Sequence, residues 1–305
     1  MRSVRFAIGL GIAFVLTACS SAGGHPAASG GAGGAGGAGG TGGTGGASLG
    51  PAPAPPPSQN CTDVASVQNT MTTYNGALFV PVWGLDKSYV AQANWWHVFN
   101  QQTMTVDGLS FSVGNSAGAA SSDNWPTGYP SFFIGAYQGR TSKASNLPKQ
   151  VSALTNVYTV LSTTASSKGN SNYNVTYDVW FTKTGAPLVT SQGNPGPGGA
   201  YLMVWFFKPS DRQPRGQSEH PGQAVSSLPG TWDVWIDHSD PLCVTYVSTT
   251  PLEKLDFDLN NFIKDAVNKG YGITTSMYLS VVSGGFEIWG GGDGLQVNAF
   301  CADVR

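Results

Sequence analysis

The chain has 305 residues, with 15 Lys and Arg against 17 Asp and Glu, so its formal net charge is −2. Charged residues make up only 10% of the chain, against about 25% in an average soluble domain. The chain has no surplus of basic residues, which would favour binding of nucleic acid. No internal apolar run reaches the ~20 residues of a membrane-spanning helix. This low charge, with abundant Ser, Thr, Asn, Gly and Trp, is typical of an extracytoplasmic β protein.

The first nineteen residues are predicted to be a lipoprotein signal peptide. Two arginines precede an apolar run at 6–16, which is too short to span a membrane. The following Leu16–Cys19 resembles a bacterial lipobox, in which the signal is cut before the cysteine and that cysteine is acylated. Cys19 is therefore the expected lipidation site, the alternative being a secretory signal with a chance cysteine. Ser20 rather than Asp at the next position implies the outer membrane or the cell surface.

A linker and one folded module are expected after the signal. Residues 20–60 are rich in Gly and Ala and then in Pro, and neither composition can bury apolar area. The remaining 61–305 is a reasonable length for a single β domain. We expect a monomer whose only contact with the membrane is its lipid.

Short runs with period-2 patterning recur along this module and predict strands. One stretch, Asp256–Lys269, has helical spacing of apolar residues, with an aspartate to begin it and Gly270 to end it. Many strands and one helix predict an all-β fold, a two-sheet antiparallel β-sandwich of the jelly-roll type. The predicted strands are Leu109–Val113, Ser131–Ala136, Val157–Ser162, Asn174–Thr182, Ala200–Phe207, Gly230–Asp237, Cys243–Thr249, Met277–Val282 and Gly294–Val304.

Three cysteines remain once Cys19 is lipidated, namely Cys61, Cys243 and Cys301. An oxidising compartment favours one disulfide among them, and the sequence leaves the choice of pair open. The four histidines have no ligand-like spacing to one another or to cysteines, so neither a metal site nor a cofactor is predicted.

Three predicted strands carry aromatic side chains beside an acidic or polar residue on one face. Apolar sugar faces stack on indoles, and a glycosidic oxygen needs a proton donor, so this pattern favours a sugar-binding face. The alternative is that these tryptophans fill the sandwich core, because Trp is highly buried on average. The residues that share a face are Asp178 with Trp180, then Tyr201 with Met203 and Trp205, then Glu287 with Trp289, and Trp83 adds an aromatic earlier.

These segments resemble the signature strands of glycoside hydrolase family 12. The resemblance rests on Tyr177–Phe181, on Tyr201–Phe206 and on Tyr278–Ser280 followed by Gly285–Glu287, and it extends to the Trp83-Gly84 pair. It implies endo-β-1,4-glucanases and xyloglucan hydrolases on a β-jelly roll with a concave cleft. Such enzymes work by retention, with two carboxylates about 5–5.5 Å apart. The implied partner is a β-glucan polysaccharide or oligosaccharide.

Carried over residue by residue, the resemblance makes Glu287 the acid/base and Asp178 an auxiliary carboxylate. The nucleophile position falls on Tyr201, where the family has a glutamate. The substrate-binding residues it implies are Trp83, Trp180, Met203, Trp205 and Trp289.

A neutral phenol cannot stabilise an oxocarbenium-like transition state as a carboxylate does, so this departure separates three hypotheses. The protein is a β-glucan hydrolase, a glycan-binding lipoprotein with impaired catalysis, or a structural lipoprotein with a vestigial cleft. The strand alternation also predicts that Met203 and Trp205 face a groove, while Leu202 and Val204 face the core. In that groove Tyr201 is expected across from Glu287.

Overall fold

The computed structural model describes most of the predicted module. The signal peptide, with Cys19, and the linker lie outside the described residues. Among the described residues no helix is long and apolar enough to cross a membrane. These residues are Cys61, 72–75, 79–84, 87–95, 102–116, 125–164, 172–186 and 194–305.

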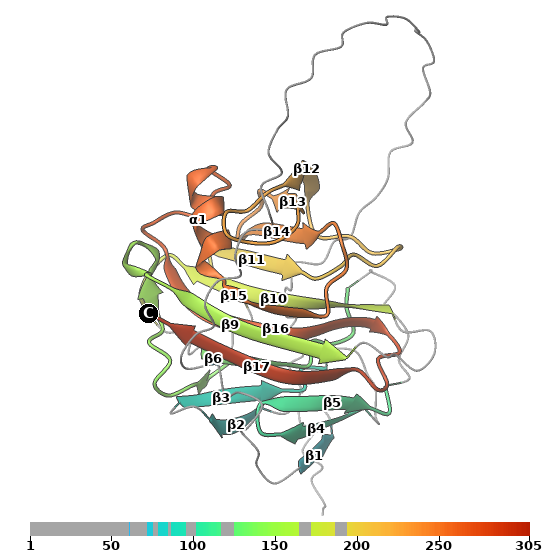
Figure 1. The fold of residues 1–305 in the computed structure, drawn as a ribbon. Helices are drawn as coiled ribbons and strands as arrows, with labels where there is room; N and C mark the ends of the chain where they lie inside the picture. The colour runs from blue at the N-terminus through green and yellow to red at the C-terminus, as the bar shows by residue number, and fades with distance from the viewer. Residues whose placement is uncertain are drawn as a thin grey trace, which may run out of the picture.

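Two sheets form the molecule, and they lie one behind the other in Figure 1. The smaller sheet has the order β1 (Thr72–Asn75), β4 (Thr103–Asp107), β5 (Ser110–Gly114), β17 (Gln296–Val304), β9 (Val157–Thr164), β15 (Lys254–Asp258). The larger has the order β12 (Gln217–Gln223), β13 (Trp232–Asp237), β14 (Leu242–Ser248), β11 (Ala200–Trp205), β10 (Asn172–Thr182), β16 (Tyr278–Gly290), β6 (Ser131–Tyr137), β3 (Lys87–Gln92), β2 (Phe79–Gly84). The short strands β7 (Arg140–Thr141) and β8 (Lys149–Gln150) pair with β6 and β16, and a 3₁₀ turn follows at Val151–Ala153.

The predicted β-sandwich is confirmed. Apolar side chains from both sheets meet in one core, to which β10 contributes Val175, Tyr177 and Val179. The pairings between described strands are antiparallel, except that β11 runs parallel to β14. Because successive side chains of a strand point to opposite faces, every second side chain of the larger sheet lies on its outer face, away from this core.

Helix α1 (Asn260–Asn268), the one α-helix within the described ranges, covers the inner face of β13 and β14, next to the smaller sheet (Figure 1). Its Phe262 ring lies 4.8 Å, between centroids, from both Trp232 and Tyr246. The predicted helix began too early, because residues 256–258 belong to strand β15. Asp258 Oδ1 accepts hydrogen bonds from the backbone N–H of Val157 and of Asn260, which ties the strand end to the helix start.

Several strands were not predicted, and β12 shows why. It lies at the edge of the larger sheet and is mostly exposed, so its sequence QSEHPGQ has no apolar alternation. It is held there by pairing with β13. Edge strands with polar residues and a proline resemble loops when only the sequence is considered.

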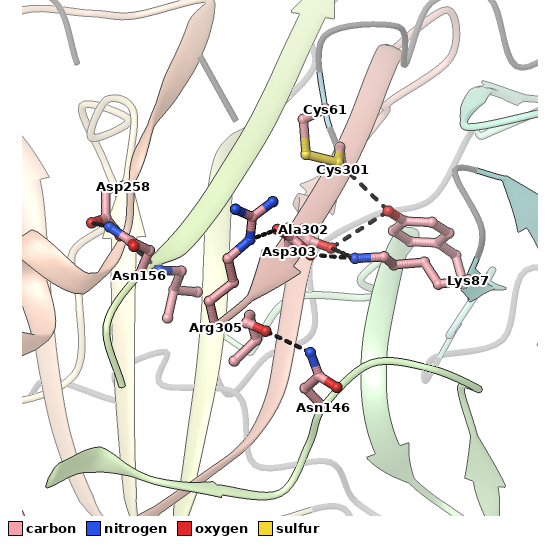
Figure 2. A network of polar contacts seen from close by, with 12 residues as sticks. Cys61, Lys87, Asn146, Asn156, Asp258, Cys301, Ala302, Asp303 and Arg305 are labelled. Atoms are coloured by element: carbon pink, nitrogen blue, oxygen red, sulfur yellow. Dashed lines mark hydrogen bonds and ion pairs between the residues drawn. A yellow bond between two sulfur atoms is a disulfide. The ribbon is translucent and has the colours of Figure 1, made fainter. Parts of the chain in front are cut away.

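Covalent and ionic contacts gather around β17, and one of them, the ion pair of Lys87 with Asp303, joins the two sheets (Figure 2). Cys61 and Cys301 form a disulfide, which settles the pairing that the sequence left open. Lys87 Nζ on β3 of the larger sheet lies 2.6 Å from Asp303 Oδ1 on β17, and both side chains are buried. Arg305 Nε donates to the other oxygen of Asp303 at 2.7 Å. The carboxylate is thus satisfied by two cations, as a buried charge requires.

Candidate functional site

A second apolar cluster lies on the outer face of the larger sheet, separate from the core between the sheets. All of its members come from strands of the larger sheet. They include Trp180 of β10, Tyr201, Met203 and Trp205 of β11, and Trp289 of β16. Leu202, Val204 and Phe206 belong instead to the core between the sheets. The predicted alternation of β11 is therefore confirmed.

Strand register decides which of these side chains are neighbours. On the central strand β10, Asp178 pairs with Met203 on one side and with Ser283 on the other. Tyr201 pairs with Trp180, which makes it a diagonal neighbour of Asp178. Residues two apart on a strand face the same way, so these side chains share the outer face.

The expectation that Tyr201 stands across from Glu287 is wrong in this structure. Glu287 pairs with Asn174, whereas Tyr201 pairs with Trp180. Six residues of β10 separate these two levels, about 20 Å of extended strand. Asp178 lies four residues along β10 from the level of Glu287. The carboxylates of Asp178 and Glu287 are therefore closer to each other than Tyr201 is to Glu287.

The aromatic side chains of the outer face pack against one another and are not open to solvent. Trp205 and Trp289 make an edge contact at 6.1 Å, and Trp180 and Tyr201 make one at 5.5 Å. The exposed fractions of these four residues are all 4% or less. The predicted open aromatic strip is thus covered. Part of the cover is Arg212, whose guanidinium lies 5.8 Å from the Trp289 ring centroid. Trp83 is in β2, opposite Ser88.

Glu287 is fully buried and is held by its partner across the strands. Asn174 Nδ2 donates to Glu287 Oε2 at 2.9 Å, and Asn174 Oδ1 accepts the backbone N–H of Glu287 at 3.4 Å. Neither residue has any exposed surface. A carboxyl group in this setting is shielded from bulk water.

Asp178 is also buried, and its environment favours the neutral acid. Burial raises its pKa from 3.8 to about 7, the proximity of the Trp180 indole lowers it in part without forming a hydrogen bond, and the nearby charge of Glu287 raises it. Asp178 Oδ1 and the indole Nε1 of Trp205 are buried without a hydrogen bond among the described residues. Buried polar atoms without partners are uncommon in native proteins.

Two further residues join this group, and the sequence assigned neither of them to the site. Ser283 Oγ donates to the backbone carbonyl of Asp178 at 2.8 Å and lies 3.3 Å from the Tyr129 hydroxyl. Burial raises the pKa of Tyr129 well above its usual range, and the charges of Asp178 and Glu287 add to this. Tyr129 therefore lies close enough to both carboxylates for their charges to act on it. The segment Tyr129-Pro130-Ser131 also resembles the family pattern, and this resemblance is the signal by which the sequence could have pointed to Tyr129.

The outer face thus combines two buried carboxyl groups, a side-chain amide that donates to one of them, and three tryptophans. Among the described residues no cluster of His, Cys, Asp and Glu could hold a metal ion. A jelly-roll sandwich with such a face is the architecture of carbohydrate-active proteins, in which rings bind sugar faces and carboxyl groups transfer protons.

Comparison with known proteins gives the family. The model of glycosyl hydrolase family 12 matches residues 87–305, and the chain belongs to this family. A curated relative is the probable cellulase Cel12b of Mycobacterium tuberculosis, which is 30% identical over 154 residues, half of this chain and 99% of that protein.

Solved structures agree with this assignment. Endoglucanase Cel12A from Rhodothermus marinus is 30% identical with a TM-score of 0.66, covering 77% of this chain and 99% of that one. The endo-1,4-β-glucanase CelB2 is 26% identical with a TM-score of 0.66, over 77% and 99% of the two chains. A family 12 xyloglucanase from Bacillus licheniformis, 18% identical with a TM-score of 0.63 over 77% and 100%, shares the fold.

Proposed function

We propose that the protein binds β-1,4-glucan chains of the cellulose or xyloglucan type on the outer face of the larger sheet, and hydrolyses them very slowly. Glu287 is the proton donor, and Asp178 is the auxiliary carboxylate. A lipid on Cys19 holds the module at the outer membrane or the cell surface. Family membership supports the substrate class, because the similar proteins above are endoglucanases and xyloglucanases by name.

The observation that carries the proposal is the set of carboxylates on the three central strands. Asp178 and Glu287 are the only carboxylates on β10, β11 and β16. In this proposal Tyr201 of β11 stands at the nucleophile position. A retaining glycosidase needs two carboxylates about 5–5.5 Å apart. Position 201 holds a phenol instead of a carboxylate, and its level on the sheet is six residues of β10 away from the level of Glu287. Both facts oppose the retaining mechanism. The unpaired Asp178 Oδ1 and Trp205 Nε1 remain as partners for sugar hydroxyls.

Binding and turnover are tested separately on the same preparation. Titration with cellotetraose should change the tryptophan fluorescence, because a glucan has to displace the cover from the buried rings. Reducing-sugar release from carboxymethyl cellulose, mixed-linkage glucan and xyloglucan should stay close to the level of Glu287→Gln. Absence of binding to every glucan would refute the proposal, and so would rapid hydrolysis that disappears in Glu287→Gln.

A variant with a carboxylate at position 201 tests the geometric part of the argument. From the register we expect Tyr201→Glu to raise turnover by less than about tenfold, since each tenfold step corresponds to 1.36 kcal/mol of barrier. The matched control is Tyr201→Phe, which removes only the hydroxyl. A rise of several hundredfold in Tyr201→Glu would show that positions 201 and 287 do approach each other with substrate bound.

A further inference from the structure

The chain takes an indirect path between β11 and β12. In the larger sheet these strands are separated by β14 and β13, whereas β10 and β16 lie on the other side of β11. The connecting residues 206–216 nevertheless reach β10 and β16. Asn172 Nδ2 of β10 donates to Asp211 Oδ2 at 2.8 Å, and Arg212 lies over Trp289 of β16. The connection therefore passes over the outer face of the central strands before it returns to the edge of the sheet.

This connection is attached firmly at its ends and weakly in its middle. Near its start, Phe207 packs against the core between the sheets. Near its end, Pro214 is buried and Arg215 pairs with Asp237 of β13. Residues 208–213, which we call the strap, are exposed or half-buried. Polar contacts at such positions contribute little to stability, because water replaces them readily.

Arg212 of the strap covers a ring two residues from the proposed proton donor. Its guanidinium is 5.8 Å from the Trp289 ring centroid, within the ~6 Å of a cation–π contact. Trp289 and Glu287 are two apart on β16, so both side chains lie on the outer face. Only 1% of Trp289 is exposed, against 14% of the Arg212 side chain. The apolar face of a glucose ring also stacks on indoles, so the guanidinium and a sugar compete for this ring.

Arginine suits a contact that has to be made and broken. Its planar guanidinium stacks on aromatic faces and stays charged, so water accommodates it once it is displaced. A leucine or a phenylalanine in its place would seal the ring, because opening the strap would then expose apolar surface to water. The strap has the sequence KPSDRQ and opens without exposing a large apolar side chain of its own.

We propose that the strap is an autoinhibitory cover of the glycan site, in which Arg212 holds the Trp289 ring until a glucan displaces it. This inference rests on the proposed function, in which the outer face binds a β-1,4-glucan. Its consequence is that the apparent affinity equals the intrinsic affinity multiplied by the fraction of molecules with an open strap. Removing the arginine raises that fraction and therefore the affinity.

Arg212→Ala tests the cover with a neutral ligand, so the lost charge neither attracts nor repels the probe. Titration with cellotetraose, followed by tryptophan fluorescence, should give a dissociation constant about two- to tenfold lower than that of the wild type, the range of a cation–π contact at a partly exposed site. Without sugar, acrylamide should quench the tryptophan fluorescence of Arg212→Ala more strongly. The matched control is Lys264→Ala, which removes an exposed cation on α1, behind the larger sheet, and should leave both measurements unchanged.

Asn172→Ala is a second variant, and it loosens the strap while Arg212 stays in place. Loss of the hydrogen bond to Asp211 should raise both the affinity and the quenching, by smaller factors. If the wild type binds cellotetraose, an unchanged or weaker affinity in a folded Arg212→Ala would overturn the inference, because Arg212 would then be a mere support or a ligand of the sugar. Absence of binding in the wild type and in both variants would refute the proposed function itself, and the cover with it. Binding by Arg212→Ala alone would support the cover.

Discussion

Replacing Asp178 by Asn should stabilise the protein at neutral and alkaline pH. Asp178 is 3% exposed, and its pKa is raised from 3.8 to about 7, chiefly by burial. The folded state therefore binds more protons than the unfolded state between about pH 4 and pH 7. Stability falls as pH rises through this window and levels off above it. The ionised aspartate destabilises the fold, and an asparagine of the same shape does not ionise.

The magnitude follows from the size of the shift. A difference of about three pH units, at about 1.36 kcal/mol each, is on the order of 4 kcal/mol. Asparagine replaces one carboxyl oxygen by a buried NH2 group without an assigned acceptor, which subtracts roughly 1 kcal/mol from this. We therefore expect Asp178→Asn to be about 3 kcal/mol more stable than the wild type at pH 8, and equal to it or slightly less stable at pH 4.

Urea unfolding of both proteins at pH 4, 5.5, 7 and 8 measures this difference, provided that the m-values agree. The control is Asp256→Asn, the same substitution at a partly exposed carboxylate on β15. A stability difference that is the same at pH 4 and pH 8 would refute the reasoning, since it would show that Asp178 does not change its charge in this window.

Three further predictions concern the frame and the anchor. Replacing Cys61 and Cys301 together by Ser should lower the free energy of unfolding by about 2–5 kcal/mol, and a change in urea midpoint below the error would contradict the role of this disulfide. Lys87→Met should cost about 3–5 kcal/mol because it leaves Asp303 with one cation fewer in a buried site, and combining it with Asp303→Leu should recover most of that loss in a double-mutant cycle. Cys19→Ala should abolish incorporation of labelled palmitate and release the protein from membranes, and an intact protein with an unmodified N-terminus elsewhere would end the lipoprotein hypothesis.

The face on which several of these side chains lie could be predicted from the sequence, because it follows a local rule. Alternation along β10 and β11 places Asp178, Trp180, Met203 and Trp205 on one face, and the structure has them there. The helix was also visible from its periodicity, although its start was not. Asp258 serves the end of β15 as well as the start of α1, and such a shared role leaves no periodic signal.

The sequence by itself determined the sandwich, the family and the identity of the carboxylates, because alternation and motifs are written along a single strand. Tertiary structure alone decided the register between strands, which sets Glu287 against Asn174 and leaves Tyr201 beside Trp180. It also decided that the aromatic face is buried, that Cys61 pairs with Cys301, and that burial raises the pKa of Asp178 to about 7. Register, burial and desolvation depend on contacts between segments far apart in the chain, and no local pattern records them.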